Sequence, residues 1–477
     1  MRQHVGLSRF WSTAVLTSAL AVSTVVVPSS TAALPADLGA AISTPVADPY
    51  YPSKGATALD TLHYDLDLRW SPRSGMLHGT ATITFRVTRD TERLRLDFSR
   101  RLAPVRARLE GQPLTVSHPR DKLVVGTPTL VGDSQHTLTV VYRGRPGPTK
   151  APTKRPDIPA LGWTDTKAGG MWTMQEPYGA FTWYPVNDHP SDKAFYDVRV
   201  DVPSSMVGVS NGALVSRRTH HGRTMTHWRM SDPASSYLVT LAIGNYVSER
   251  DKGPHGLPLT YWVPRDRQGY LPMLRRSPGI LRWLERTLGP YPFDRAGVVV
   301  VPSDSAMETQ ELVTMGTGRL SSTRPAVSVL AHEYAHQWYG DTVTPDNWQD
   351  LWLNESFAMY VEIQFRIARG WETERWWRRL LEGNDQLLRT KYGPPGAYKP
   401  TDFASACVYY CGALMLFELG DAIGSAELEG ALRARPQQQQ NTNANRGHYV
   451  TWVSDRVGTD LTDFFDAWLM SRTTPPT

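Results

Sequence analysis

The chain has 477 residues, of which 40% are hydrophobic and 10% are aromatic, and this composition excludes an intrinsically disordered or low-complexity protein. The length favours two domains rather than one. Its 51 basic and 46 acidic residues leave a net charge of +5, which is too small an excess over such a length to indicate a nucleic-acid partner. The two cysteines, Cys407 and Cys411, cannot provide a disulfide framework, so a hydrophobic core must stabilise the fold.

Residues 1–33 are typical of a secretory signal peptide. Arg2 and Arg9 precede an apolar run, Trp11–Val27, and small residues follow it up to Ala33. An uncleaved membrane anchor is the alternative, but the run has about 17 residues, fewer than the roughly 20 that span a bilayer. We therefore expect cleavage near residue 33, no stable membrane span afterwards because no later segment is apolar enough, and a secreted or cell-envelope-associated protein.

The next part of the chain predicts a linker, residues 34–55, followed by a β domain, residues 56–247. The linker prediction rests on several prolines and the absence of periodicity. In the β domain, apolar and polar residues alternate as they do in strands with one buried face. The first such strand carries Leu62, Tyr64, Leu66, Leu68 and Trp70 on its apolar face. The stretch 144–156, rich in Gly, Pro, Lys and Arg, is expected to be a surface loop within this domain.

From residue 248 to residue 477 the pattern is mainly helical. Cap and stop residues with helical periodicity predict helices over 277–288, 325–340, 354–369, 376–388 and 408–419. The Gln-rich run 437–440 is expected to be a loop. The predicted fold class is therefore α+β, with an N-terminal antiparallel β-sandwich followed by a mainly helical domain.

The predicted helix over 325–340 contains the pattern HExxH. His332 and His336 are four residues apart, so both imidazoles project from one face of a helix and can bind a single metal ion, most naturally Zn²⁺. Glu333 follows the first histidine and can accept a proton from a water molecule at the metal. The alternative is two histidines on a helix surface that bind no metal. However, the composition predicts only about 0.02 chance occurrences of HExxH in a chain of this length.

A catalytic zinc ion usually has a third protein ligand. Glu355 is the candidate, because it lies on the next predicted helix with 18 residues between it and His336. That spacing is long enough for the chain to turn and return to the metal. An exposed helix acid is the alternative interpretation of this residue.

Two sequence segments, HEYAHQWYGD over 332–341 and LWLNESFAMYVE over 351–362, strongly resemble the aminopeptidase N family of zinc metallopeptidases, relatives of leukotriene hydrolase/aminopeptidase. The resemblance implies a thermolysin-like catalytic domain over 248–477 and one Zn²⁺ per chain. It also implies peptide substrates with a free N-terminus. Large members carry a further helical domain that covers the active site. Only 122 residues follow Glu355 here (477 − 355), so we expect a short form with a more open cleft.

Three further residues match the family's functional positions. Glu176, in a segment that begins at Met174, and Glu308, in SAMETQ, fall on the residues that bind the substrate's α-ammonium. The second segment departs from the family's GAMEN pattern at two positions, where Ser305 replaces Gly and Thr309 replaces Asn. Tyr409 matches the tyrosine that donates to the oxyanion of the transition state, with Tyr410 as its rival. The resemblance thus implies Glu333 and Tyr409 as catalytic residues and His332, His336 and Glu355 as metal ligands.

Some features around this site leave alternatives open. Glu362 or Asn354 is a candidate partner for a ligand histidine, and Glu362 could equally be a solvated helix charge. We do not expect Cys407 and Cys411 to pair, because Cα atoms four apart in a regular helix lie about 6 Å from each other, near the long end of the range for a disulfide. Two other functions also remain: a thermolysin-like endopeptidase, and a secreted binding protein with an inactive metal site.

Overall fold

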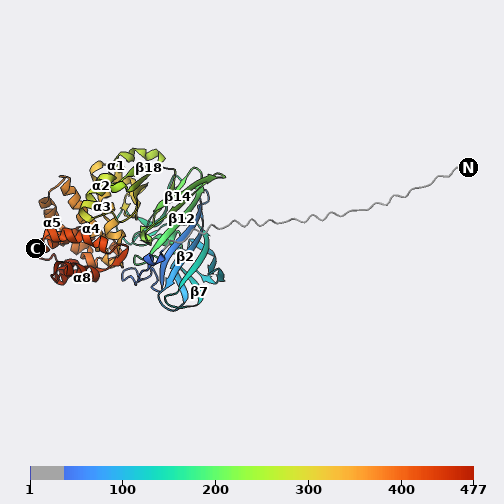
Figure 1. Cartoon of the computed structure of the whole chain (residues 1–477), viewed down its shortest axis with the longest axis horizontal. Helices are drawn as coiled ribbons and strands as arrows, with labels where there is room; N and C mark the ends of the chain where they lie inside the picture. Colours follow the sequence, from blue (N-terminus) through green and yellow to red (C-terminus); the bar gives the residue numbers. More distant parts are fainter. Residues whose placement is uncertain (2–36, 477) are drawn as a thin grey trace. The chain divides into compact units, whose positions relative to one another are not determined.

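The computed structural model describes residue 1 and residues 37–476, in which a β domain precedes a mainly helical domain (Figure 1). The predicted signal peptide, residues 1–33, lies outside the described residues apart from Met1. The predicted α+β class with two domains is confirmed.

A large sheet forms the framework of the β domain. Its strands are, in spatial order, β14 (Ala213–His220), β15 (Arg223–Arg229), β12 (Lys193–Pro203), β1 (Leu59–Ser71), β2 (Met76–Val87), β8 (Gln135–Gly144), β4 (Leu102–Leu109) and β5 (Gln112–Leu114), with β16 (Ala234–Ser235) paired to β12. The alternation predicted around Leu66 is confirmed, because the apolar residues of β1 are buried. Neighbouring strands are antiparallel except β1 and β12, which are parallel.

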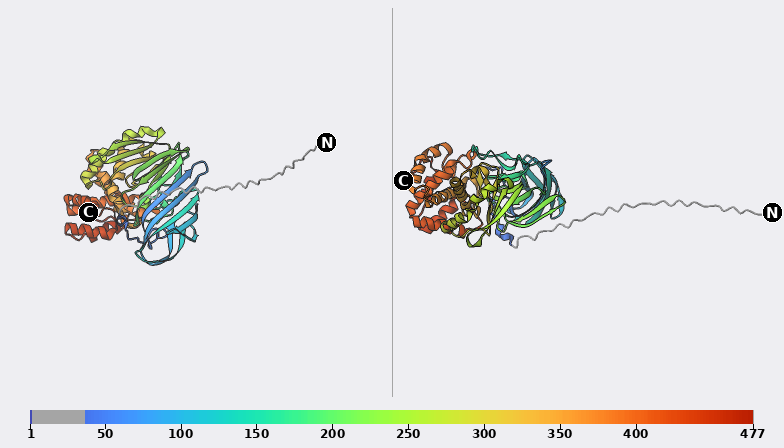
Figure 2. Two further views of the ribbon diagram at one scale, coloured as in Figure 1. Left: turned by 45° about the vertical axis from the view of Figure 1, so that its right-hand side comes forward. Right: turned by 90° about the horizontal axis from the view of Figure 1, so that it is seen from above.

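Two smaller sheets complete this domain. The strands of the whole domain are drawn in blue to green in Figure 2. One contains β13 (Val207–Ser210), β17 (Leu241–Gly244), β11 (Met171–Met174), β10 (Ala160–Asp165) and β9 (Thr149–Lys150). The other contains β3 (Thr91–Asp97), β7 (Lys122–Leu130) and β6 (Val116–Ser117). The loop before β10 bonds to the helical domain through Pro152 and Phe403. The segment after β11 carries Glu176, which lines a cavity together with residues of the helical domain.

The segment 34–55 was expected to be a linker. The part of it that the structure describes instead packs against the rest of the protein. Residues Leu38–Ala41 form a short 3₁₀ helix. The buried carboxylate of Asp48 accepts a hydrogen bond from the backbone N–H of Trp348 at 2.7 Å, and the Tyr51 hydroxyl donates to the carbonyl of Pro400 at 2.8 Å. Its prolines suppress regular structure, but these contacts fix the segment against the helical domain.

The helical domain begins with a five-stranded sheet. Its strands are, in spatial order, β18 (Tyr246–Lys252), β19 (Pro258–Pro264), β20 (Ala296–Val301), β22 (Val313–Gly316) and β21 (Ala306–Met307). The helices are α1 (Leu271–Leu274), α2 (Ser277–Leu288), α3 (Thr323–Ala335), α4 (Trp352–Ala368), α5 (Glu374–Tyr392), α6 (Ala406–Ile423), α7 (Ser425–Gln438), α8 (Arg446–Val457) and α9 (Thr462–Met470). A short parallel pair joins β23 (Val343–Pro345), which lies between α3 and α4, to β24 (Thr442–Ala444), which lies between α7 and α8.

All five predicted helices are present, with one difference that affects the site. The helix expected to continue to Gly340 ends at Ala335, and a wider turn follows over Gln337–Asp341. Tyr339 and Gly340 leave the helical conformation there, with Gly340 at a φ of 135° that favours glycine. Part of the Gln-rich run expected to be a loop belongs instead to the end of α7.

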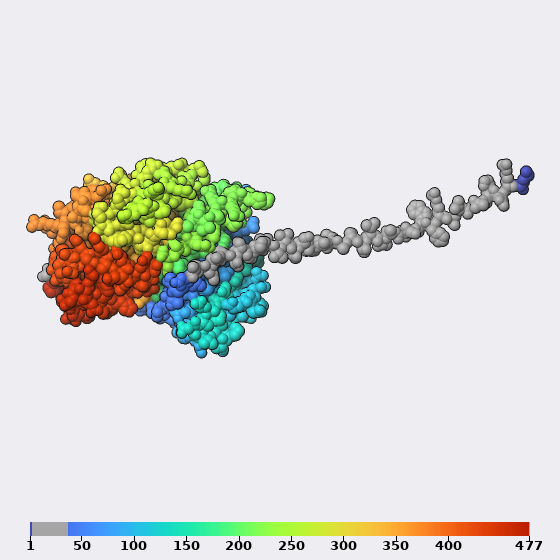
Figure 3. All heavy atoms as spheres, viewed as in Figure 1, coloured from blue at the N-terminus to red at the C-terminus, as the bar shows by residue number. Residues whose placement is uncertain are grey.

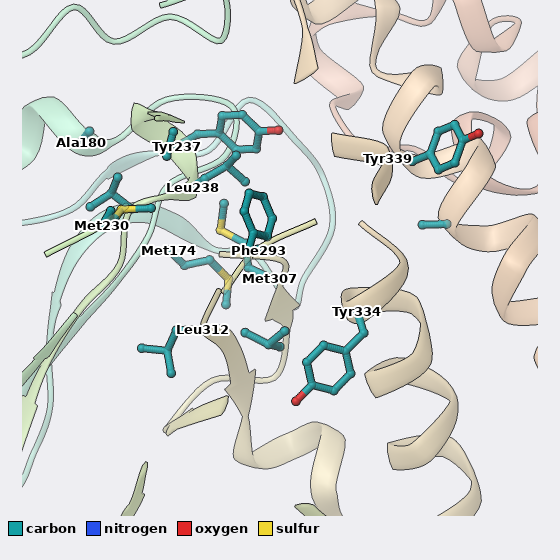
Figure 4. Packing of buried hydrophobic residues seen from close by; sticks show 14 of the residues in the cluster. Met174, Ala180, Met230, Tyr237, Leu238, Phe293, Met307, Leu312, Tyr334 and Tyr339 are labelled. Atoms are coloured by element: carbon teal, nitrogen blue, oxygen red, sulfur yellow. The ribbon is translucent and has the colours of Figure 1, made fainter. Parts of the chain in front are cut away.

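A continuous hydrophobic core joins the two domains. Figure 4 shows Met174 and Leu238 of the β domain close to Met307 and Leu312 of the helical domain, and all four side chains are buried. In the space-filling view the two domains meet along an extended surface (Figure 3). Burial of apolar side chains on both sides favours a fixed arrangement of these domains.

Among the described residues, α6 is the one helix long and apolar enough to cross a membrane, with a mean hydropathy of 1.4. The expectation that no segment after the signal region has this composition was therefore wrong. However, 61% of the helix is buried inside the structure, where it packs between α4 and α5. A core helix satisfies the same length and composition requirements.

Candidate active site

The predicted metal ligands meet at one point. His332 and His336 lie at the end of α3, and Glu355 lies in the first turn of α4. The Nε2 atoms of the two histidines are 3.1 Å apart. The Oε2 atom of Glu355 lies 3.3 Å from Nε2 of His332 and 3.2 Å from Nε2 of His336. All three residues are buried.

This donor triangle fits zinc. Tetrahedral coordination with bonds of about 2.0–2.1 Å separates adjacent ligand atoms by about 3.3 Å, which matches the three distances. Although burial opposes the change, His332 and His336 lower the pKa of the Glu355 carboxyl. Two imidazoles and one carboxylate are the ligands of many catalytic zinc sites.

Each ligand histidine has an oxygen atom near its Nδ1 atom, on the side of the ring away from the donor triangle. Glu362 Oε2 lies 3.3 Å from Nδ1 of His332, and Glu362 also accepts a hydrogen bond from Ser328 at 2.5 Å. The Nδ1 atom of His336 lies 3.0 Å from the carbonyl oxygen of Tyr339. Of the two candidate partners, Glu362 therefore has the geometry to orient a ligand. Asn354 instead donates to the hydroxyl of Tyr237 at 3.2 Å.

Glu333 lies in the same cavity as the donor triangle. The cavity has a volume of 470 Å³ and is lined by Glu176, Glu308, His332, Glu333, His336, Glu355, Tyr409 and other residues. Burial raises the pKa of Glu333 to about 7, although the neighbouring histidines oppose this change. A carboxyl group that exchanges its proton near neutral pH is suited to general acid–base chemistry.

Two further acids line the cavity, and they come from different domains. Glu176 follows β11, whereas Glu308 follows β21. Burial raises the pKa of both carboxyls, and the charge of Glu308 raises that of Glu176 further. Within the described part of the chain, neither Oε1 atom has a hydrogen-bond partner. Two acids that repel each other and lack partners form a site for a cationic group.

Tyr409 reaches the metal ligands from α6. Its hydroxyl donates to Oε1 of Glu355 at 2.5 Å, and its ring stacks on that of His332 with centroids 5.9 Å apart. Close approach of α6 to α4 makes this possible, because a Cβ atom added at Gly412 would lie 1.8 Å from Oγ of Ser356. The rival Tyr410 is 37% exposed and lacks such a contact with a ligand.

The expectation that the cysteines do not pair was wrong. Cys407 and Cys411 form a disulfide in the first turns of α6. Their Cα atoms are 4.8 Å apart rather than about 6 Å, so the backbone here is tighter than a regular helix and within the range for a bridge. Both residues are buried next to Tyr409 and Tyr410.

Sequence reasoning missed one residue of this site, Arg155. The stretch 144–156 was expected to be a surface loop, but the Nη1 atom of Arg155 donates to the Tyr409 hydroxyl at 2.9 Å. Basic residues at 150, 154 and 155 look equivalent in the sequence. Nothing in the local pattern shows that Arg155 is the one in contact with the site, because its partner lies 254 positions away.

Two known protein domain families match this chain, and both are peptidase domains, as the metal-binding geometry of the site would suggest. The Peptidase M1 N-terminal domain matches residues 60–238, and the Peptidase family M1 domain matches residues 274–468. The chain belongs to the M1 peptidase family. The predicted resemblance is thereby confirmed, and zinc is the cofactor of the site.

Several relatives and solved structures are similar to this M1 chain. It is 24% identical over 324 residues to Aminopeptidase M1 of Arabidopsis thaliana, and 27% identical over 335 residues to Glutamyl aminopeptidase of Rattus norvegicus. These matches cover 64% of this chain but 37% and 35% of those proteins, so the chain spans about a third of their length.

Two solved structures match over most of their length. A mutant M1 zinc metallopeptidase from Deinococcus radiodurans, bound to a Tyr-Ser-Ala substrate, is 27% identical with a TM-score of 0.79. A two-domain M1 zinc metallopeptidase mutant bound to L-tryptophan is 28% identical with a TM-score of 0.80. Each match covers 90% of this chain and 98% of the other.

Proposed function

We propose that this protein is a zinc-dependent aminopeptidase that removes residues from the N-terminus of peptides. The observation that carries the proposal is the position of Glu176 and Glu308, whose carboxylates lack partners among the described residues and line the same cavity as the zinc ligands. A structural neighbour in the M1 family was solved with a tripeptide substrate bound, which supports a peptide as the ligand class.

The two acids explain why the enzyme would act at a chain end. The α-ammonium of a peptide is a cation, and two carboxylates bind it by charge-assisted hydrogen bonds. Binding of substrate then offsets the repulsion between Glu176 and Glu308. Because the ammonium is held at a fixed distance from the metal, the first peptide bond is the one placed for hydrolysis.

The residues that line the cavity support the following chemical roles. Zinc held by His332, His336 and Glu355 would supply Lewis acidity, which would activate water and polarise the scissile carbonyl group. Glu333 accepts a proton from the attacking water and delivers it to the leaving nitrogen. Tyr409 donates its O–H to the oxyanion, and a donor in this position is commonly worth about 2.7 to 4 kcal/mol of transition-state stabilisation.

A pair of substrates tests the proposal. An aminoacyl anilide and its N-acetylated form differ only in the ammonium charge that Glu176 and Glu308 would bind. We expect the free-amine substrate to be hydrolysed at least about 100-fold faster in kcat/KM, since an unpaired charge in a buried site is costly. Equal hydrolysis of both would instead support an endopeptidase. No hydrolysis of either, with zinc bound, would support a binding protein.

We also propose that the protein is exported. Support comes from the sequence pattern of residues 1–33 and from the disulfide between Cys407 and Cys411, because disulfides persist in oxidising compartments. N-terminal sequencing of protein recovered from the medium and from the cell envelope is the test. We expect a mature chain that starts near residue 34. Full-length protein confined to the cytoplasm would contradict export.

A further inference from the structure

A loop of the β domain, residues 151–159, crosses to the helical domain and is fixed there. Between β9 and β10, the carbonyl of Pro152 accepts a hydrogen bond from the backbone N–H of Phe403 at 3.0 Å. The hydroxyl of Thr153 donates to the carbonyl of Phe403 at 2.8 Å. These bonds attach the loop to the residues immediately before α6, which carries Tyr409.

Several residues of this loop line the cavity, and Arg155 is the one that contacts Tyr409. Its Nη1 atom donates to the Tyr409 hydroxyl at 2.9 Å and lies 3.4 Å from the carbonyl oxygen of Ala404. Its Nε and Nη2 atoms donate to the two carboxylate oxygens of Asp157 at 3.2 and 2.7 Å. Arg319 of the helical domain donates to Asp157 at 2.7 Å.

This arrangement occupies all three guanidinium nitrogens. A bidentate arginine–carboxylate pair fixes the plane of the guanidinium group, and the second arginine fixes the carboxylate. Arg155 is therefore arranged to orient a neighbouring group rather than to bind part of a substrate. The neighbouring group is the oxygen of Tyr409.

The contact determines where the phenolic proton points. A hydroxyl group has one hydrogen and two lone pairs. Because Arg155 occupies a lone pair of the Tyr409 oxygen, the O–H is directed into the cavity, where it meets Glu355 in the described structure. An oxyanion formed in that cavity would accept the same hydrogen, and the positive charge of Arg155 would favour its negative charge.

We propose that Arg155 is a positioning residue that holds Tyr409 for oxyanion stabilisation, so that a loop of the β domain contributes to the hydrolytic step. The proposal rests on the proposed aminopeptidase function. It predicts that the effect of Arg155 passes through the hydroxyl of Tyr409 and is lost when that hydroxyl is absent.

A double-mutant cycle tests this coupling. R155A, Y409F and the R155A/Y409F double variant are compared with the wild type in kcat and KM for an aminoacyl anilide. We expect R155A to lower kcat about tenfold or more with little change in KM, because the contact acts in the transition state. In the Y409F background the same change should cost less than about threefold in kcat. Similar losses in both backgrounds, or a loss confined to KM, would overturn the proposal.

A second readout does not depend on turnover. Binding of a phosphinic dipeptide, whose tetrahedral phosphinate resembles the oxyanion, is measured by calorimetry for the same four proteins. We expect R155A to weaken binding about tenfold in the wild-type background and to have no effect in Y409F. Equal weakening in both backgrounds would overturn the proposal. A wild type that is inactive and does not bind the probe would overturn the aminopeptidase function as well.

Two further variants control for folding. Arg100 is a mostly exposed arginine of the same domain that pairs with Asp121 at 3.8 Å, so R100A should retain wild-type kcat and zinc content. R155K keeps the positive charge at the loop but cannot make a bidentate pair and contact Tyr409 together. It should fold with full zinc content and still lose kcat. A fully active R155K would show that charge alone is required and would overturn the positioning role.

Discussion

The hydroxyl of Tyr409 donates to the carboxylate of Glu355 at 2.5 Å, which links the proposed oxyanion donor directly to a zinc ligand. The two residues lie on neighbouring helices, α6 and α4. Their contact depends on Gly412, where a Cβ atom would lie 1.8 Å from Oγ of Ser356. The geometry of the site is therefore determined by how closely the two helices pack.

Replacing Gly412 with alanine tests this dependence. We expect G412A to destabilise the protein by about 1–3 kcal/mol, the usual cost of an extra methyl group in a packed core, and to lower kcat by moving Tyr409 away from Glu355. Urea unfolding and steady-state kinetics measure the two effects.

A glycine elsewhere serves as the matched control. Gly383 is exposed in the middle of α5, and a Cβ atom there would meet no other atom within 4 Å. G383A should therefore stabilise the protein by about 0.5–1 kcal/mol and leave kcat unchanged. If G412A and G383A behaved alike, close packing of α4 and α6 would not control the site.

Glu333→Gln tests the proposed general base. The substitution keeps the size of the side chain but removes its ability to accept a proton. We expect kcat to fall by at least about 100-fold, the lower range of general-base contributions, while the protein retains one equivalent of zinc. Metal analysis and kinetics on the same sample provide the measurement. An unchanged rate would exclude Glu333 from the reaction.

The sequence predicted the site well where partners lie close along the chain. His332 and His336 are one helical turn apart, so periodicity alone places them together, and Glu355 follows on the next helix. Glu176 and Glu308 required the resemblance to a known family, because they follow strands of different domains. Arg155 could not be predicted, since its contact depends on how a loop of one domain meets the other. The disulfide was missed because α6 is locally tighter than a regular helix.

Glu362 should control zinc affinity. Its Oε2 atom lies 3.3 Å from Nδ1 of His332, and loss of such a neighbour of a ligand histidine typically weakens metal binding about 10- to 100-fold. We expect E362Q to lose zinc to a competing chelator at correspondingly lower concentrations. Glu374, half-exposed at the start of α5, provides the control, because E374Q leaves every zinc contact in place. Equal zinc affinity of both variants would contradict the role of Glu362.

A buried carboxylate in the β domain predicts a pH dependence of stability. Although burial opposes it, hydrogen bonds to His63 and His227 and the charge of Arg229 lower the pKa of Asp197 to about 2. A carboxyl group whose pKa is lower in the folded state stabilises the protein above its unfolded pKa, near 4, and this contribution is lost as the pH falls toward 2. Acidification should therefore reduce the advantage of the wild type over D197N.

Urea unfolding at several pH values measures this effect. At pH 7 the wild type should exceed D197N by about 1–2 kcal/mol, after allowance for solvent screening, and the difference should shrink between pH 4 and pH 2. Asp133, which is 82% exposed, is the control, and D133N should show no comparable pH-dependent difference. A constant difference for D197N across this range would contradict the assigned ionisation.

The most direct test of the account is a crystal structure of the E333Q variant with zinc and an uncleaved tripeptide. We predict one zinc ion bonded to Nε2 of His332, Nε2 of His336 and a carboxylate oxygen of Glu355 at about 2.0–2.2 Å. The peptide's α-ammonium should lie within hydrogen-bond distance of both Glu176 and Glu308. A metal bound elsewhere, or a peptide whose amine lies away from these acids while its chain continues through the cavity, would contradict the account.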